Sequence, residues 1–272
     1  MSTESENEKS GERYAFFDLD HTLIPFDTQV LFCNHVLRRE PWRILYLLIF
    51  IPVIPLAALK LIRSRNLKRI FMSYLWRMPK ERLEKHVSEF VGNTVDAWIY
   101  PEVRAELERH KKEGRTVILT TASPGMYGFA IGKLLGVDHT FATDVPIPER
   151  MPLIPDVIGA NNKRGDKIIH MEKGGVLPEG FDPAKPYPIP DSYSYTDSPA
   201  DLPLLAIAEN GRLIHPGPVL AEEGEKNGWE TLLPDRPYGS RAGNVWAMFR
   251  QMLGLYGKVN RPPSNSSQKE AK

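Results

Sequence analysis

The chain has 272 residues, with 35 basic and 34 acidic side chains and a formal net charge of +1. This balance argues against a nucleic-acid-binding protein, which usually carries a strong basic excess. The single cysteine, Cys33, excludes an intrachain disulfide and a thiolate metal cage, and 42% hydrophobic residues are ordinary for a globular protein. With no apolar leader segment in residues 1–12, these features favour a cytoplasmic protein.

The pattern along the chain predicts an α/β protein with a doubly wound, mostly parallel sheet and an inserted helical cap. The polar residues 1–12 and the polar, proline-broken residues 258–272 are predicted to be disordered tails. Residues 13–27 and 96–257 are predicted to form the core, and residues 28–95 the cap.

The first apolar run starts at Tyr14 and leads directly into Asp18 and Asp20, and Thr22 follows. Such a run predicts a strand buried on both faces of a parallel sheet. Because side chains alternate along a strand, Asp18 and Asp20 are expected to point the same way, and a divalent cation or a retained proton would relieve their repulsion. The alternative is that this stretch only ends a strand and caps a helix.

A turn at Ile24–Thr28 follows, and Thr28 is predicted to cap the first cap helix. The next segment, Ile44 to Leu59, has no charged residue. As a helix its 16 residues would measure about 24 Å, less than the roughly 30 Å of a bilayer core. Pro52 and Pro55 would also interrupt it, so we do not expect it to span a membrane.

Two interpretations of this apolar segment remain. It forms a helical hairpin packed inside a small module, which we favour, or it forms a surface that dips into a membrane. Basic residues within 38–69 flank it on both sides, and they would suit anionic lipid headgroups or phosphorylated substrates: Arg38, Arg39, Arg43, Lys60, Arg63, Arg65, Lys68 and Arg69.

From Pro101 onward, helical and strand patterns alternate. The strand Thr116–Thr120 ends at Thr121-Ala122-Ser123, where hydroxyls and free N–H groups predict an anion site or an ordinary helix cap. Lys163 and Lys167 lie near the start of a later helix, where a cation is unfavourable for the helix dipole and therefore hints at function. Close to the end of the chain, Trp246, Met248, Phe249, Met252 and Leu253 are predicted to share one face of a helix.

A later strand, near Ser192–Thr196, ends at Asp197, and Asp201 follows where a helix begins. The carboxyl ends of parallel strands meet at one edge of a sheet, where ligands of such folds bind. Hard carboxylate oxygens from Asp18, Asp20, Asp197 and Asp201 suit Mg²⁺, and a threonine and a lysine suit a phosphoryl group.

This ordered set resembles the haloacid dehalogenase superfamily of phosphatases, in its phosphoserine-phosphatase-like branch. The Asp-x-Asp-x-Thr signature is present at 18–22, and the metal motif at 197–201. The apolar cap and the run from Tyr195 to Leu205 are similar to bacterial phosphatidylglycerophosphatase C and its relatives.

The resemblance implies that Asp18 is the nucleophile that forms an aspartyl-phosphate, and that Asp20 is the general acid and base. It implies Mg²⁺ held by Asp18, the Asp20 carbonyl and Asp197, supported by Asp201. Thr121, Ala122 and a lysine would bind the phosphoryl group. Of Lys167 and Lys163 we favour Lys167, because Ile168 and Met171 after it match the helix that follows the lysine in relatives.

The resemblance leaves the substrate open. It could be a small phosphorylated metabolite, or a lipid headgroup phosphate of the phosphatidylglycerophosphate type met at the inner face of the membrane. A non-catalytic phosphate-binding module is a further alternative, although it would have no need of Asp20 as an acid.

Overall fold

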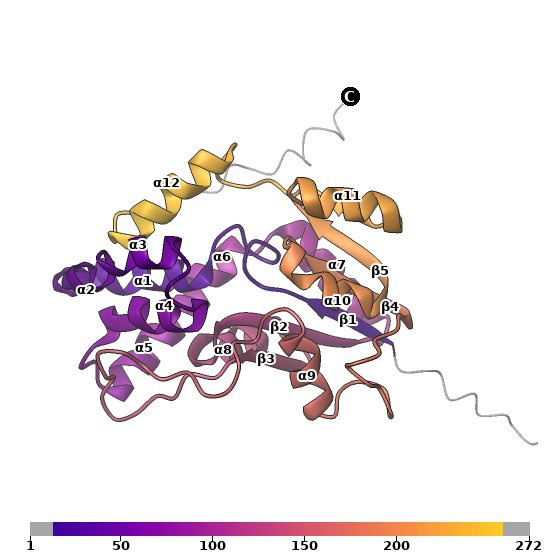
Figure 1. Ribbon diagram of the computed structural model, residues 1–272, viewed down its shortest axis with the longest axis horizontal. Helices are drawn as coiled ribbons and strands as arrows, with labels where there is room; N and C mark the ends of the chain where they lie inside the picture. The colour runs from indigo at the N-terminus through magenta and orange to yellow at the C-terminus, as the bar shows by residue number, and fades with distance from the viewer. Residues whose placement is uncertain (1–12, 258–272) are drawn as a thin grey trace, which may run out of the picture.

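The computed structural model describes residues 13–257 of the chain (Figure 1). Both predicted tails, 1–12 and 258–272, lie outside the described residues.

A six-stranded sheet forms the centre of the fold, and all its strand pairs are parallel. The strand order is β3-β2-β1-β4-β5-β6, with β1 in the interior of the sheet. This confirms the predicted α/β class with a doubly wound sheet. The strands are β1 (Tyr14–Phe17), β2 (Thr116–Pro124), β3 (His139–Thr143), β4 (Ile189–Thr196), β5 (Ala208–Ile214) and β6 (Glu230–Leu232).

Both faces of the sheet are covered, and the alternation of side chains along β1 shows why its sequence is continuously apolar. Ala15 and Phe17 belong to one core cluster, which includes residues of α7 (Pro101–Lys112) and α8 (Gly125–Leu135). Tyr14 and Phe16 belong to a second cluster, with residues of α9 (Asp166–Lys173) and α10 (Leu202–Ala206). A third, smaller cluster joins α11 (Pro218–Asn227) to β5 through Leu220 and Leu213.

Between β1 and β2 the chain builds a group of helices that lies at one end of the molecule in Figure 1. Its members are α1 (Thr28–Arg39), a 3₁₀ segment (Pro41–Tyr46), α2 (Leu47–Phe50), α3 (Val53–Ala58), α4 (Ser64–Phe71), a second 3₁₀ segment (Met72–Leu75), α5 (Lys80–Phe90), a π-helical turn (Val91–Val95) and α6 (Asp96–Trp98).

The C-terminal helix α12 (Arg241–Met252), which lies in the predicted core range 96–257, packs against α1 of this group of helices, which we call the cap. The Tyr46 hydroxyl donates a hydrogen bond to the Met252 carbonyl at 3.0 Å. The Asn34 side chain of α1 also exchanges two hydrogen bonds with the backbone of Tyr256. In space, therefore, the cap is completed by residues from the far end of the sequence.

The residues predicted to share one apolar face of α12 are only partly covered. Trp246 and Phe249 are 60% and 49% exposed, and their rings stack at 5.6 Å. Met248 and Met252 instead face inward, next to the buried Ala247 and Gln251. Helix α12 rests on α1 as an outer layer, so only one narrow side of it is covered.

The predicted cap at the start of α1 is wrong by one residue. Asp27 is the N-cap, and its carboxylate accepts hydrogen bonds from Gln29 N and Val30 N. Thr28 is the first helical residue, and its hydroxyl is used in the site described below.

The favoured interpretation of residues 44–59 as a packed hairpin is wrong as well. The chain turns near Pro52 between the two short helices α2 and α3. Most of the large apolar side chains of residues 44–59 face solvent, with Leu48 74% and Leu59 70% exposed. Within residues 13–257, none of the helices has both the length and the apolar character that crossing a bilayer requires.

Candidate active site

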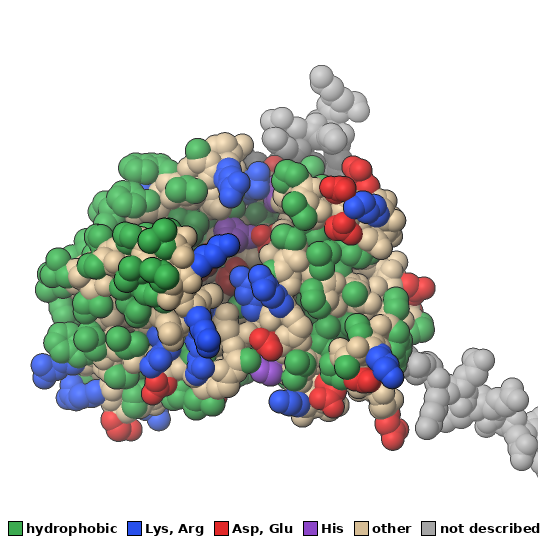
Figure 2. Space-filling view, in the orientation of Figure 1, with side chains coloured by type: hydrophobic (Ala, Val, Ile, Leu, Met, Phe, Trp, Pro, Cys, Tyr) green, Lys and Arg blue, Asp and Glu red, His purple; other side chains and the backbone are tan. Residues whose placement is uncertain are grey.

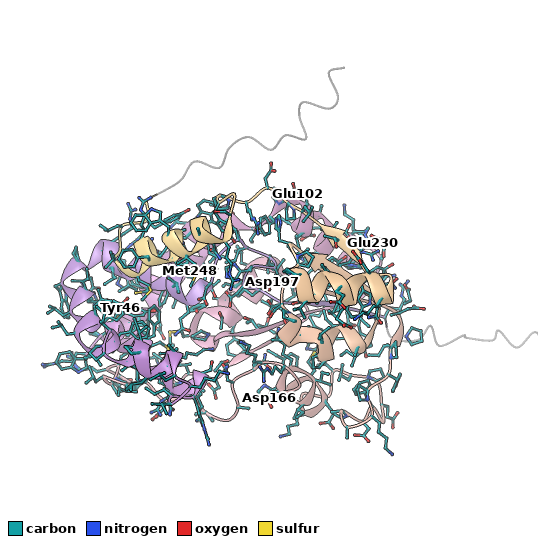
Figure 3. All side chains as sticks on the ribbon, turned by 45° about the horizontal axis from the view of Figure 1, so that its top comes forward. Tyr46, Glu102, Asp166, Asp197, Glu230 and Met248 are labelled. Carbon is teal, nitrogen blue, oxygen red and sulfur yellow. The ribbon has the colours of Figure 1, made fainter. Side chains whose placement is uncertain are left out.

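The acidic residues of the two signature segments meet because β1 and β4 are neighbours in the sheet. Phe17 pairs with Tyr195, so Asp18, just after β1, lies beside the end of β4, where Asp197 follows. The backbone N–H of Asp18 donates to the Tyr195 carbonyl at 3.0 Å. In Figure 3, Asp197 is seen between the helices of the cap and those of the core.

Lys167 connects two of the predicted acids. Its Nζ lies 2.7 Å from Asp18 Oδ1 and 2.8 Å from Asp201 Oδ2. Its side chain comes from the first turn of α9 and is only 1% exposed. A buried ammonium needs such carboxylate partners, which explains why the cation lies at a helix start that the dipole disfavours.

Thr22 connects the nucleophile candidate to the metal motif. Its hydroxyl oxygen lies 3.2 Å from Asp18 Oδ2 and 3.4 Å from Asp197 Oδ1, and it accepts a hydrogen bond from Asp197 N. The chain reverses at His21, which adopts φ 59, so Thr22 returns toward the strand end. This left-handed conformation is uncommon for a residue with a side chain and is typical of functional turns.

Asp20 is held on the other side of the turn, against the cap. Its Oδ1 accepts from Thr28 N at 2.7 Å and from the Thr28 hydroxyl at 2.6 Å, and its Oδ2 accepts from the Ser123 hydroxyl at 2.6 Å. The two hydroxyl oxygens are themselves 2.6 Å apart. Asp20 is therefore fixed by one residue from the first helix of the cap and one from the end of β2.

Burial dominates the electrostatics of the acids. It raises the pKa of Asp18, while Lys167 opposes this rise. Burial also raises the pKa of Asp197 to about 6, against the opposing effect of His21. For Lys167, burial disfavours the charge, but Asp18 and Asp201 outweigh it and raise the pKa of the ammonium. The acids at this edge thus outnumber the ammonium paired with them, and further positive charge would favour their ionised forms.

A cavity of about 560 Å³ opens over these residues, between the cap and the core. Figure 2 shows this hollow near the centre of the molecule, with basic side chains around it. Its core side carries the acids and Lys167, whereas its cap side is mainly apolar. The apolar lining consists of Val30, Phe50, Ile54, Ala57, Leu67, Phe71, Met248 and Met252.

The other predicted phosphate-binding residues occupy different positions. Ala122 and Lys163 line the cavity, but the Lys163 side chain is exposed and extends from a loop before α9. Thr121 is fully buried and does not line the cavity, and its Oγ1 accepts a hydrogen bond from Ser123 N. Its neighbour Ser123 lines the cavity instead.

Sequence reasoning missed the contacts that three side chains make in this site: those of Thr28, Ser123 and Lys68. The sequence predicts Lys68 to be one of the basic residues that flank the apolar segment. Its Nζ instead donates to the Ala122 carbonyl and, at 2.8 Å, to Asn161 Oδ1, inside the cavity. Burial lowers the pKa of Lys68 to about 8. Ser123 belongs to the stretch predicted as an anion site, so only Thr28 and Lys68 lacked a local signal.

Carboxylate oxygens of Asp18 and Asp197 are the ligands available to a cation. Within residues 13–257, no three His, Cys, Asp or Glu side chains converge in the manner of an all-protein metal cage. That arrangement fits Mg²⁺, which is usually bound by one or two carboxylates and completes its shell with water and substrate phosphate.

Known proteins resemble this chain in sequence and in fold. A protein of Streptomyces azureus described as inhibiting morphological differentiation is 26% identical over 242 residues, which cover 85% of this chain and 82% of that protein. A structure of a protein of unknown function from Bordetella pertussis Tohama I matches 82% of this chain and 99% of its own, with a TM-score of 0.65 and 23% identity.

A structure of phosphoserine phosphatase, as an analogue of its phospho-aspartyl intermediate, matches 83% of this chain and 94% of its own. Its TM-score is 0.53 at 17% identity, a likeness that concerns the fold. The model of the haloacid dehalogenase-like hydrolases matches residues 15–206, which contain all the acids described above. The predicted family is therefore confirmed: the chain belongs to the haloacid dehalogenase-like hydrolases.

Proposed function

We propose that this hydrolase is a Mg²⁺-dependent phosphomonoester phosphatase that acts through an aspartyl-phosphate on Asp18. One observation carries the proposal: the Asp18 carboxylate is held 2.7 Å from the Lys167 ammonium while Asp20, two residues on, is held separately by Thr28 and Ser123. One acid is thus placed beside a cation, as a nucleophile for a phosphate dianion requires, and the other is kept free of that cation.

The residues present fit Mg²⁺. Asp18 and Asp197 offer hard oxygens that share Thr22 as a hydrogen-bond partner, and burial raises the pKa of both acids. Asp18, the Asp20 carbonyl and Asp197 would hold the ion, and Asp201 would support the site through Lys167. When bound, Mg²⁺ neutralises charge on the phosphoryl group and the acids.

In the first step, an oxygen of Asp18 attacks phosphorus, and the bond between phosphorus and the leaving-group oxygen breaks. The Asp20 carboxyl gives its proton to that oxygen, so the alcohol leaves neutral. Lys167 and Ala122 both line the cavity, and in the proposal they bind the phosphoryl oxygens.

In the second step, Asp20, now a carboxylate, takes a proton from a water molecule. The resulting hydroxide attacks phosphorus, inorganic phosphate leaves, and the Asp18 carboxylate is restored. Asp20 regains its proton in this step, so the residues return to their starting state.

The substrate is a phosphomonoester, either of a small metabolite or of a lipid headgroup. A small substrate is supported by the likeness in fold to phosphoserine phosphatase, whose name states a small phosphorylated substrate. The apolar cap side of the cavity supports a substrate with an apolar part, and that in turn supports action at the inner face of the membrane.

The experiment that tests the proposal is phosphate release from an aryl phosphate with and without Mg²⁺. We expect Asp18→Asn to reduce kcat at least about a thousandfold, because the amide is a poor nucleophile. The variant should unfold at a temperature close to that of the wild type, which shows that the fold is kept. A non-catalytic phosphate-binding module would bind inorganic phosphate, and wild type and variant would both release none.

A further inference from the structure

The helices α2 and α3 and the residues beside them carry an unusual concentration of exposed apolar side chains. We call this set the apolar cap surface. Figure 2 shows hydrophobic side chains gathered over this end of the molecule. The set consists of Trp42, Ile44, Leu45, Leu48, Ile51, Ile54, Leu56, Leu59 and Leu61, with exposed fractions from 37% to 74%. A patch of this kind on a globular protein marks an interaction site.

The charged residues of the stretch that carries this surface are of one sign. Positions 41–80 contain no Asp or Glu and eight Lys or Arg residues. Some of these cations are used inside the fold: Arg43 is buried against Glu40, Arg69 pairs with Asp156, and Lys68 enters the cavity.

This stretch also has exposed cations next to the apolar cap surface in sequence, Lys60, Arg63 and Arg65, and the exposed Arg38 of α1 is a fourth. Among residues 13–257, no carboxylate pairs with any of them. Arg38 and Arg65 donate only to the neutral carbonyls of Tyr256 and Val157, so they keep their net charge. An apolar surface rimmed by unpaired cations is complementary to a bilayer that contains anionic lipids.

The shape of the segment suits the plane of an interface. Helices α2 and α3 have four and six residues, and the chain turns between them near Pro52. Helices this short could insert only a few side chains into a bilayer and could not cross it. Trp42 at the edge of the surface is 55% exposed, and tryptophan is enriched at the headgroup level of membranes.

The apolar cap surface is continuous with the catalytic cavity. Ile54 belongs to both, because it is 43% exposed and also lines the cavity. Phe50 and Ala57, from the same two helices, line the cavity behind it. One face of the hairpin thus meets the outside and the other meets the space above Asp18 and Asp20.

We propose that the apolar cap surface docks on an anionic bilayer, and that the substrate is a phosphomonoester of a membrane lipid. The substrate class rests on the phosphatase function proposed above, whereas the docking does not. With the cap on the bilayer, the phosphate of a lipid reaches the acids while its apolar part stays along Phe50, Ile54 and Ala57.

The test uses the full chain and vesicles of phosphatidylcholine, alone or with phosphatidylglycerol. We expect the wild type to float with the anionic vesicles. The double variant Leu48→Asp/Leu59→Asp changes residues outside the cavity and should no longer float. The matched control Val219→Asp/Leu233→Asp adds the same charges at positions 63% and 69% exposed outside the cap, and it should float like the wild type.

The cations are tested in the same way. Lys60→Gln/Arg63→Gln should weaken binding to anionic vesicles about fivefold for each charge removed. Lys112→Gln/Lys133→Gln, two exposed cations of the core, should leave it unchanged.

Measurements of phosphate release then test the proposed lipid substrate separately from the proposed docking. Wild type should hydrolyse phosphatidic acid in the anionic vesicles, and Leu48→Asp/Leu59→Asp should lose at least about tenfold of this rate while keeping its rate on a soluble aryl phosphate. The docking proposal would be overturned if Val219→Asp/Leu233→Asp lost flotation as fully as Leu48→Asp/Leu59→Asp, or if the wild type did not float. So would a dimer in solution that Leu48→Asp/Leu59→Asp dissociates without vesicle binding, since the surface would then be a contact between copies.

Flotation together with no release from any phosphomonoester would overturn the phosphatase function and leave docking standing. Release from the aryl phosphate together with no release from phosphatidic acid by a floating wild type would overturn the lipid substrate alone.

Discussion

Lys167 Nζ lies 2.7 Å from Asp18 Oδ1, although 149 positions separate the two residues in the sequence. Both side chains are buried, and Asp201 accepts from the same ammonium. A buried cation between two acids does two things: it keeps the acids compatible with burial, and it places positive charge where a phosphate dianion would arrive.

Lys167→Met should therefore impair both stability and catalysis. We expect the free energy of unfolding at pH 7 to fall by about 3 kcal/mol, because Asp18 and Asp201 lose their buried partner. Phosphate release should fall by at least about a hundredfold. Urea unfolding and steady-state kinetics measure the two effects. Lys163→Met is the matched control, since the Lys163 side chain is exposed, and an equal effect of both variants would contradict the role given to Lys167.

The hydroxyls that hold Asp20 should affect kcat more than KM. Thr28→Val and Ser123→Ala each remove one hydrogen bond to the Asp20 carboxylate. Because Asp20 is proposed to transfer the proton in both steps, a poorly oriented carboxyl should lower kcat about tenfold and leave KM nearly unchanged. Thr28→Ser keeps the hydroxyl and should behave like the wild type. A loss of activity in Thr28→Ser as large as that in Thr28→Val would indicate that packing, and not the hydrogen bond, matters.

The lowered pKa of Lys68 leads us to expect that substrate binding depends on pH. Burial lowers its pKa to about 8, so its charge is present below that pH and is lost as the pH rises through it. KM for an anionic phosphomonoester should consequently rise above pH 8 in the wild type. In Lys68→Met, KM should be higher at pH 7 and should not rise further near pH 8. Kinetics between pH 6.5 and about 9 would show this, and an unchanged profile in the variant would be inconsistent with a Lys68 contact to substrate.

The lowered pKa of His35 leads us to expect that the folded state loses stability in acid. Burial and then Arg39 lower its pKa to about 3, and its Nε2 has no hydrogen-bond partner within the described part of the chain. Above pH 6.5 both the folded and unfolded forms are neutral, so His35 has no effect. As the pH falls below 6.5, only the unfolded chain gains a proton, so the folded state loses stability until the pH reaches about 3.

At pH 5 this effect amounts to about 2 kcal/mol for one histidine. His35→Phe keeps a ring of similar size beside Phe32 and Phe90 and removes the titrating group. Urea unfolding at pH 7 and pH 5 should show a smaller difference for the variant than for the wild type. The same difference in both proteins would mean that other groups cause the acid sensitivity.

The placement of the acids could be anticipated because it depends on local pattern and on one general property of parallel sheets. A continuous apolar run identifies β1, and the residues that follow its last position must lie at the carboxyl edge. The same holds for Asp197 after β4. A cation at a helix start is unfavourable unless a partner elsewhere compensates it, which pointed to Lys163 or Lys167, and the resemblance to relatives favoured Lys167.

The partners of Asp20 could not be anticipated in the same way. Thr28 looks like a cap from sequence, because threonine often caps helices, and only the path of the chain at His21 brings its hydroxyl to Asp20. From the sequence, Lys68 resembles the other surface cations of its stretch, and only the tertiary structure shows that α4 lines the cavity.

By itself, then, the sequence determined the parallel α/β sheet and the acidic edge of that sheet, since strand period and strand ends are properties of neighbouring residues. Only the tertiary structure decided which way the apolar segment 44–59 and helix α12 face. A segment without charges has no polar side to mark its solvent face, and α12 packs on α1, some two hundred positions earlier. Long-range packing alone decides such orientations, and here it leaves the apolar cap surface exposed beside the cavity.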